Sequence, residues 1–280
     1  MDLRRRSKIP RDGATRDATP LDVAVAANDR ATIATVRAAV AGRRMRLAFQ
    51  PVVRTQDTGR IAFHEGLIRV LDPAGRIIPA RDFMAAIQDT ELGREVDCAA
   101  VELGLAELAV NPGLRLSLNM SARSIGYRRW VDTLRRGLDL SPPVGERLIL
   151  EISESSAMTL PEVVMTFMEE MQARGVAFAL DNFGAGHTEM RHLKDFFFDI
   201  LKIDGQFIRG IDNDPNRQAL VAAINGFARE FQMFSVAESI ETVEEANYLA
   251  SIGVDCLQGY LFGAPTIRPE WAGQNTRKQA

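Results

Sequence analysis

The sequence predicts an α/β fold in which eight strands and their connecting helices form a TIM-like (β/α)₈ barrel with an antiparallel first strand. Three observations lead to this prediction. Strand-like and helical segments alternate along the chain, two helices end at a glycine just before a strand, and only a short turn separates the first two strands. The length of 280 residues suits one such barrel; an open doubly wound sheet is the alternative.

The expected strands are short apolar runs that end at turn residues or charged residues. Runs of this kind are typical of strands that are buried on both faces, as in a parallel barrel. Eight segments fit the description: 47–53, 61–70, 114–119, 147–152, 176–181, 199–203, 233–237 and 254–258.

Helical patterns occupy most of the intervals between these strands. An alanine-rich segment, 21–44, favours one or two helices ahead of the first strand. Further helices are predicted over 80–109, 122–138, 160–173, 188–194, 216–231 and 242–251. Gly175 and Gly253 each follow a helix at a place where a left-handed residue is needed, and a strand beginning with valine comes next. Strands joined in this way run parallel, with right-handed crossovers.

The first two strands are the exception to this pattern. Only residues 54–60 separate them, and Asp57-Thr58-Gly59 has the composition of a hairpin turn. The chain should therefore begin with one antiparallel pair. Because no linker interrupts the sequence, we expect one barrel domain over 20–268, a flexible basic tail over 1–19 and a C-terminal tail over 269–280.

The composition excludes several classes of function. A net charge of −3 provides no electrostatic reason to expect a nucleic-acid partner. Asn28-Asp29-Arg30 interrupts the alanine-rich segment, so it should not span a membrane, and no secretory signal follows the basic start. Cys98 and Cys256 lie in apolar contexts, as expected for core thiols in a reducing compartment. The sequence therefore predicts a cytoplasmic protein without nucleic-acid or membrane partners.

Polar residues fall inside or just after seven of the apolar runs. In a barrel, the carboxyl ends of the strands meet at one rim, where function gathers. Burying such groups is costly, and a structural ion pair would explain one isolated instance. A converging set instead predicts a site made of Glu65, Asn119, Glu151, Asp181, Lys202, Glu238 and Gln258.

The residue types at this rim indicate the chemistry. Carboxylate and amide oxygens suit Mg²⁺ or Mn²⁺ better than zinc. The three histidines, His64, His187 and His192, lack the spacing of a metal-binding motif, and no Ser-His-Asp set, P-loop or G-x-G-x-x-G is present. Hard-metal sites at such rims commonly act on phosphoesters. The residues alone therefore predict a metal-dependent barrel enzyme, a phosphoester hydrolase.

Eight short motifs extend this reading through a family resemblance. They are F-Q-P-V-V (49–53), E-G-L-I-R (65–69), N-M-S (119–121), E-I-S-E-S (151–155), D-N-F-G-A-G (181–186), L-K-I-D (201–204), A-E-S-I-E-T (237–242) and Q-G-Y-L-F (258–262). In this order they resemble the EAL-domain family of cyclic di-GMP phosphodiesterases over about residues 44–265. The resemblance implies a TIM-like barrel with one antiparallel strand, and hydrolysis of cyclic di-GMP to linear pGpG.

The resemblance also implies a role for each matching position. The implied metal ligands are Glu65, Asn119, Glu151 and Asp181, with Asn182 near a second metal. The implied catalytic residues are Glu65, Lys202, which would hold the attacking water, and Glu238, the proposed general base. The implied substrate-binding residues are Gln50, Leu67, Arg69, Asp204, Glu241 and Gln258, and Glu154 would anchor the loop after the fifth strand.

The sequence departs from the family pattern at several of these motifs. Gly66 occupies the second position of the E-A-L signature, a small-for-small change, while Ser153 and Ser239 replace a Thr and a Gly. Asn182 replaces a second Asp. Since an amide brings no negative charge, weaker binding of the second metal and a lower rate are expected.

The loop after the fifth strand also departs, because His187-Thr188-Glu189 replaces Tyr-Ser-Ser. In the family this loop couples dimerisation to catalysis, so the resemblance implies a homodimer through it. Two alternatives to an active phosphodiesterase stay open. One is a catalytically weak domain that acts as a cyclic di-GMP receptor or as a protein-interaction scaffold. The other is a barrel with unrelated phosphoester chemistry.

Overall fold

A computed structural model describes residues 20–184 and 196–272, with side chains from residue 30 onward. Eight strands close into a ring: β1 (Met45–Arg54), β2 (Asp57–Leu71), β4 (Leu116–Met120), β5 (Leu148–Ser153), β6 (Ala177–Phe183), β7 (Ile200–Ile203), β8 (Phe234–Ala237) and β9 (Cys256–Gln258). β1 is antiparallel to both β2 and β9, and every other neighbouring pair in the ring is parallel. The predicted barrel with an antiparallel first strand is confirmed, and the open sheet is wrong.

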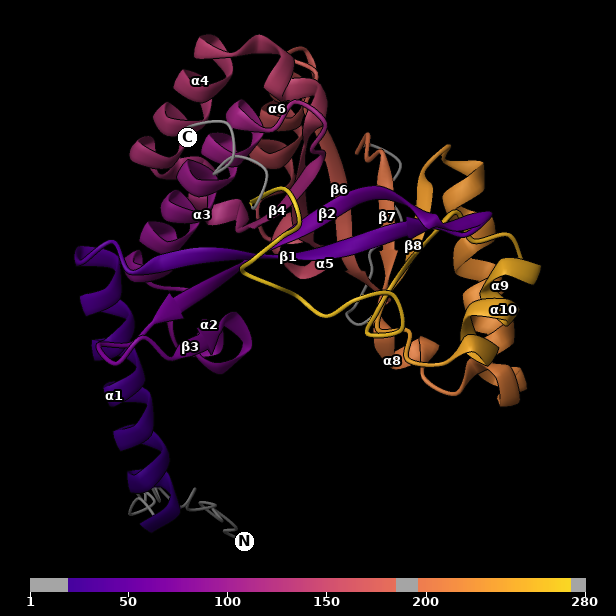
Figure 1. Ribbon diagram of the computed structural model, residues 1–280, viewed down its shortest axis with the longest axis horizontal. Helices are drawn as coiled ribbons and strands as arrows, with labels where there is room; N and C mark the ends of the chain where they lie inside the picture. The colour runs from indigo at the N-terminus through magenta and orange to yellow at the C-terminus, as the bar shows by residue number, and fades with distance from the viewer. Residues whose placement is uncertain (1–19, 185–195, 273–280) are drawn as a thin grey trace, which may run out of the picture.

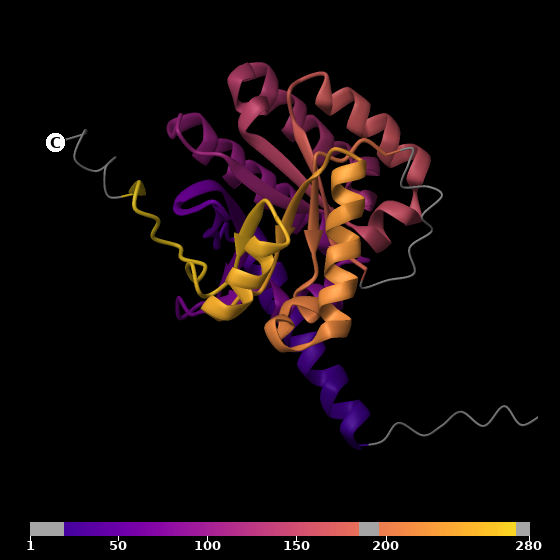
Figure 2. The ribbon, with the colours of Figure 1, turned by 90° about the vertical axis from the view of Figure 1, so that its right-hand side faces the viewer.

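Helices surround this ring, as Figures 1 and 2 show. The longer ones are α1 (Pro20–Ala41), α3 (Glu91–Val110), α4 (Arg128–Leu140), α6 (Pro161–Gln172), α9 (Pro215–Glu230) and α10 (Val243–Ser251). The large apolar cluster lies between helices and strands, and a second, smaller one fills the barrel interior. Helix α1 is one continuous helix that projects away from the barrel. No helix within the described ranges is long and apolar enough to cross a membrane.

Short elements account for most differences from the sequence prediction. The expected helix over 80–109 is broken into η1 (Ala80–Asp82), α2 (Met84–Ile87) and α3. Further short elements were not predicted: β3 (Ile77–Pro79), α5 (Glu154–Thr159), α8 (Gly205–Ile208), η2 (Ala122–Gly126), η3 (Pro142–Arg147) and η4 (Ile211–Asn213). Elements of three to six residues are too short to show a hydrophobic period. The helix expected over 188–194 and the tail over 1–19 lie outside the described residues.

The two glycine turns form as the sequence predicts, whereas the first hairpin turn lies at a different position from the one expected. Gly175 and Gly253 have the expected left-handed backbone, with φ of 85° and 73°. The first hairpin turns at Thr55-Gln56, because β1 ends at Arg54 and β2 already begins at Asp57. The polar segment expected to form the turn is therefore paired as strand.

Gly66 shows how tightly the ring is packed, and it yields a first prediction. A Cβ added at Gly66 would lie 2.8 Å from Leu118 Cδ2 and 3.2 Å from both Leu116 Cδ1 and the Ser117 carbonyl oxygen. We expect Gly66→Ala to lower the free energy of unfolding by about 1–2 kcal/mol in urea denaturation, because Leu118 must move.

The control for this prediction is the double variant Gly66→Ala/Leu118→Val. Shortening Leu118 makes room for the new methyl group, so the double variant should be more stable than the sum of the two single changes allows. Strict additivity would show that contact with Leu118 is not the reason for glycine at this position.

Candidate active site

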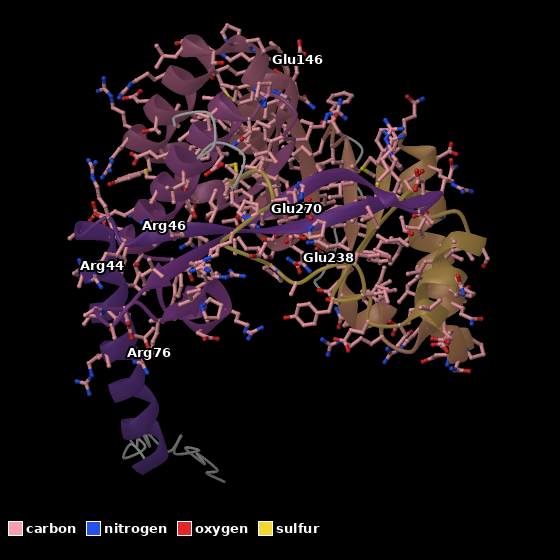
Figure 3. The ribbon with its side chains drawn as sticks, in the orientation of Figure 1. Arg44, Arg46, Arg76, Glu146, Glu238 and Glu270 are labelled. Atoms are coloured by element: carbon pink, nitrogen blue, oxygen red, sulfur yellow. The ribbon has the colours of Figure 1, made fainter. Side chains whose placement is uncertain are left out.

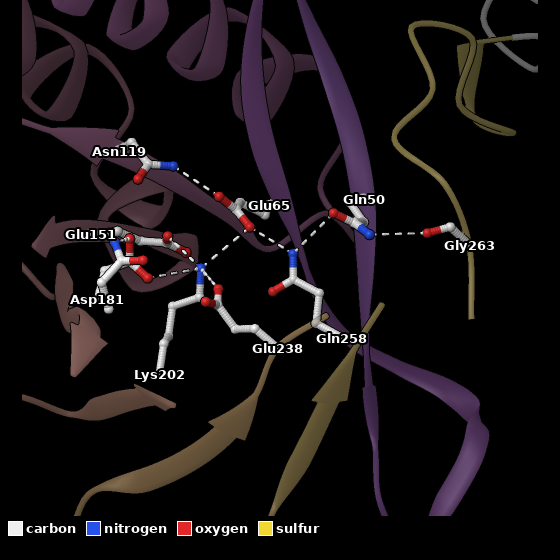
Figure 4. A network of polar contacts seen from close by, with 10 residues as sticks. Gln50, Glu65, Asn119, Glu151, Asp181, Lys202, Glu238, Gln258 and Gly263 are labelled. Carbon is white, nitrogen blue, oxygen red and sulfur yellow. Dashed lines mark hydrogen bonds and ion pairs between the residues drawn. The ribbon is translucent and has the colours of Figure 1, made fainter. Parts of the chain in front are cut away.

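Eight polar side chains converge towards one end of the barrel; seven come from strands of the ring, and Glu238 directly follows β8 (Figure 4). Side chains two residues apart on a strand point to the same side. Most of these polar residues therefore stand directly above the small apolar cluster in the barrel interior. We call them the polar layer: Gln50, Glu65, Asn119, Glu151, Asp181, Lys202, Glu238 and Gln258.

Lys202 lies at the centre of the polar layer, and its side chain is 1% exposed. Its Nζ is 2.7 Å from Glu151 Oε2, 2.8 Å from Glu238 Oε1, 3.3 Å from Glu65 Oε2 and 3.5 Å from Asp181 Oδ1. A buried ammonium is costly unless opposite charges surround it. Four carboxylates therefore hold Lys202 in its charged form.

Glu65 connects Lys202 to the amides of the polar layer. Asn119 Nδ2 donates to Glu65 Oε1 at 2.8 Å, and Gln258 Nε2 donates to Oε2 at 2.6 Å. Gln258 Nε2 also lies 3.3 Å from Gln50 Oε1, and Gln50 Nε2 donates to the Gly263 carbonyl at 3.1 Å. These contacts, drawn in Figure 4, fix the orientation of the Glu65 carboxylate.

Burial and mutual repulsion shift the pKa values within the polar layer. Burial raises the pKa of the Glu151 and Glu238 carboxyls to about 8, and it also raises the pKa of Asp181. Burial acts in the same direction on Glu65, but the charge of Lys202 and the amide hydrogen bonds outweigh it and lower that pKa. Burial opposes charge on Lys202, yet the carboxylates raise its pKa well above the ordinary value.

The oxygen atoms of the polar layer fit a hard divalent cation. Glu151 Oε1 and Asp181 Oδ1 are buried and accept no hydrogen bond from any described residue. Together with Glu65 and Asn119 they provide carboxylate and amide oxygens. The excess of acid over the single ammonium also favours a further cation. Among the described residues, no three acidic, histidine or cysteine side chains already have the spacing of a metal site; the carboxylates converge on Lys202 instead.

Asn182 lies beside this set in a left-handed backbone conformation, with φ of 55°. Asparagine tolerates that region better than most residues. The Asn182 Nδ2 donates to Asp181 Oδ2 at 2.6 Å, a bond that an aspartate could not make. Ser239, where the family has a glycine, is also left-handed, with φ of 59°. Asn182 thus satisfies one oxygen of Asp181 without adding charge.

Glu154 makes a contact at the start of the loop after β6. It is the first residue of α5 and is 3% exposed, and the Gly184 amide donates to Glu154 Oε2 at 3.0 Å. Residues 185–195, which include most of that loop and the expected dimer contact, lie outside the described residues.

A cavity of about 330 Å³ opens over the polar layer and collects most of the predicted substrate-binding residues. Those that line it are Gln50, Leu67, Arg69, Glu241 and Gln258, together with Glu65 and Glu238. Asp204 is not among the lining residues. Its carboxylate accepts a hydrogen bond from the Gln206 amide at 2.7 Å and so caps α8.

The lining also includes residues to which the sequence assigned no role, among them Arg81, Arg209 and Tyr260. Arg81 belongs to η1, within the segment predicted as one long helix, and Arg209 directly follows the unpredicted α8. Arg209 Nη2 lies 3.7 Å from Glu241 Oε1. The one sequence signal for Arg209 is its position. It lies five residues after Asp204, the last residue of the L-K-I-D motif, in the segment D-G-Q-F-I-R.

Comparison with known proteins places these features in a family. The sequence matches the EAL domain family over residues 33–265. It is 31% identical over 207 residues to cyclic di-GMP phosphodiesterase PdeF of Escherichia coli. The aligned region covers 72% of this chain and 28% of PdeF. It is 30% identical over 235 residues to the bifunctional diguanylate cyclase/cyclic di-GMP phosphodiesterase MucR of Pseudomonas aeruginosa, with coverage of 82% and 34%. The chain thus spans about a third or less of the length of these relatives.

Solved structures of EAL domains also resemble this chain in fold. The structure described as PaMucR phosphodiesterase in complex with c-di-GMP superposes with a TM-score of 0.73 at 28% identity, covering 84% of this chain and 97% of that one. The FimX EAL domain of Xanthomonas citri superposes with a TM-score of 0.77 at 24% identity, covering 89% and 99%, and supports the fold alone. Since the family match extends over most of the chain and includes the entire polar layer, the chain belongs to the EAL domain family.

Proposed function

We propose that this chain hydrolyses cyclic di-GMP to linear pGpG in the bacterial cytoplasm, with Mg²⁺ or Mn²⁺ as cofactor, and so lowers a second messenger. The observation that carries this proposal is the buried Lys202 ammonium among four carboxylates, below a cavity lined by Arg69. The similarity to PdeF and to the PaMucR phosphodiesterase supports the substrate and the reaction.

Glu65, Asn119, Glu151 and Asp181 would hold the metal, with Asn182 beside them. When bound, the metal would polarise a phosphoryl oxygen and acidify water. Glu65 is held in place for this task by the two amide donors of the polar layer.

The chain's own cations and acids would do the remaining work. Lys202 would orient the attacking water by donating a hydrogen bond, and Glu238, which lies 2.8 Å from Lys202, would accept the proton that the water loses. The raised pKa of Glu238, about 8, suits a group that takes up a proton near neutral pH. The Arg69 guanidinium lines the cavity, where it would bind a phosphate.

The test is incubation of the purified protein with cyclic di-GMP and Mg²⁺ or Mn²⁺, with products separated by chromatography. We expect conversion to pGpG that requires metal and is lost in Glu65→Ala. Tight binding of cyclic di-GMP without turnover would instead establish a receptor. Neither binding nor turnover would leave the scaffold function.

The receptor function is the second candidate, and Asn182 is the observation that favours it. We expect Asn182→Asp to increase hydrolysis and to lower the metal concentration needed for half-maximal rate by about tenfold, because an added ligand charge strengthens divalent binding. In the absence of metal the same change should reduce the melting temperature, since the Asn182–Asp181 hydrogen bond becomes a repulsive contact.

Three controls separate the explanations for this variant. Asn182→Ala removes the hydrogen bond without adding charge and should lower stability without increasing the rate. A rate that is already high in the natural protein and unchanged in Asn182→Asp would show that the amide is tolerated. A large gain would place the natural protein near the receptor function.

We also propose that the chain forms a homodimer through the loop after β6. Light scattering at micromolar concentration tests this directly. A monomer under conditions in which hydrolysis is observed would contradict the proposal.

A further inference from the structure

A second cavity, of about 760 Å³, opens at the barrel end opposite the polar layer. Its lining includes Ala177, Phe234 and Cys256, which are the first residues of β6, β8 and β9. Figure 3 shows Glu146, on the rim of this cavity, well apart from Glu238 of the polar layer. We call it the amino-end cavity, because the parallel strands begin there.

The floor of the amino-end cavity is apolar. Ile149, Ile200 and Val236 form it. Each lies two residues before a member of the polar layer, namely Glu151, Lys202 and Glu238. Ala62 and Ala177 are small neighbours that leave the space above them open. Protein interiors are otherwise close-packed, and the volume falls within the range of small-molecule sites, about 300–1,000 Å³.

Two guanidinium groups on the rim have no partner among the residues that the structure describes. Arg54 and Arg115 line the cavity and are exposed. Neither guanidinium makes a hydrogen bond or an ion pair with any group in the described part of the chain. The cavity therefore presents unpaired positive charge above an apolar floor.

Three acids, Glu146, Asp199 and Asp255, share this lining with four arginines. None of the three forms an ion pair with Arg54 or Arg115 in the described part of the chain. Asp199 Oδ2 accepts a hydrogen bond from the Phe178 amide at 2.8 Å, and Asp255 Oδ2 accepts from the Ser235 amide at 2.9 Å. These two carboxylates are therefore hydrogen-bonded to the main chain, whereas Glu146 is exposed. In addition, Thr55 Oγ1 is buried and has no hydrogen-bond partner within residues 20–184 and 196–272, so an unused hydroxyl accompanies the cations.

We propose that the amino-end cavity binds a small organic anion with a flat apolar body, such as an aromatic carboxylate. The guanidinium fork of Arg54 or Arg115 matches a carboxylate with two parallel hydrogen bonds. The apolar body would cover Ile149, Ile200 and Val236 and remove them from water. Such a ligand is chemically distinct from a cyclic dinucleotide, and its site lies at the far end of the barrel from the proposed reaction.

The test uses the full chain, labelled at its Ile, Leu and Val methyl groups, and 1-naphthoate as the probe. We expect shifts of the Ile149, Ile200 and Val236 methyl signals, with a Kd of about 1 mM or tighter. At least one of Arg54→Gln and Arg115→Gln should weaken binding about tenfold. Arg129→Gln removes an exposed guanidinium on α4 that does not line the cavity, and it should leave the Kd unchanged.

Neutral 1-naphthamide is the matched control for charge. It should bind about tenfold more weakly than 1-naphthoate, because it cannot pair with a guanidinium as an anion. Equal affinity for the two probes, or no effect of either rim substitution, would overturn the proposal. Shifts confined to methyl groups outside the amino-end cavity, or no shifts at all, would overturn it as well.

Discussion

Replacing Lys202 by methionine is expected to lower the free energy of unfolding of the metal-free protein by about 3–5 kcal/mol and to reduce hydrolysis at least about 100-fold. Methionine fills a similar volume but leaves Glu65, Glu151, Asp181 and Glu238 without the ammonium at their centre. Breaking a buried ionic set by removing one partner is costly because the remaining charges stay buried. Urea denaturation and chromatographic rate measurements test both effects.

The pH dependence of the stability of the natural protein is a second test of the same carboxylates. Burial raises the pKa of Glu151 and Glu238 from 4.5 to about 8, so the folded protein binds more protons than the unfolded chain between these values. Metal-free stability should therefore fall as pH rises from about 4.5 to 8, and it should fall further in Lys202→Met.

Leu201→Met is the matched control for this variant. Leu201 is buried beside Lys202 in the sequence, and exchange for methionine at such a site costs less than about 1.5 kcal/mol. If Lys202→Met were no less stable than Leu201→Met at pH 8, the ammonium would not be what holds the four carboxylates together.

Replacing Glu65 by glutamine is expected to reduce hydrolysis by more than about 100-fold while leaving the barrel folded. Losses of ten- to a hundredfold are typical when a group behind a metal ligand is removed, so losing a ligand itself should exceed them. Glutamine retains the shape of Glu65, but it has one acceptor oxygen for the donors Asn119, Gln258 and Lys202. Rates at saturating metal and cyclic di-GMP test this directly.

Two controls show whether the loss of activity in Glu65→Gln is specific to this carboxylate. Glu102→Gln removes a carboxylate from an exposed ion pair with Arg129 and should leave the rate unchanged. Circular dichroism should show the same helix content in both variants. Full activity in Glu65→Gln would contradict the assignment of Glu65 to the proposed metal site.

Much of the site was accessible from sequence because a barrel relates strand order to position. Glu65, Glu151 and Lys202 were predicted to share a rim because each lies on a strand of the barrel. In the structure both carboxylates lie within 3.3 Å of Lys202 Nζ. Asp204 belongs to a matching motif, but its carboxylate caps α8 and does not line the cavity. A motif identifies a segment, whereas the direction of each side chain depends on the local backbone.

The sequence by itself determined the eight strands of the ring, their order and the residue types at its carboxyl end, because these follow from hydrophobic period and chain connectivity. Only the tertiary structure decided that Lys202 occupies the centre of the four carboxylates, that Leu118 fills the space beside Gly66, and that Arg81 and Arg209 reach the same cavity. It also decided that the opposite end of the barrel is open. These features depend on contacts between segments far apart in sequence, which no local pattern encodes.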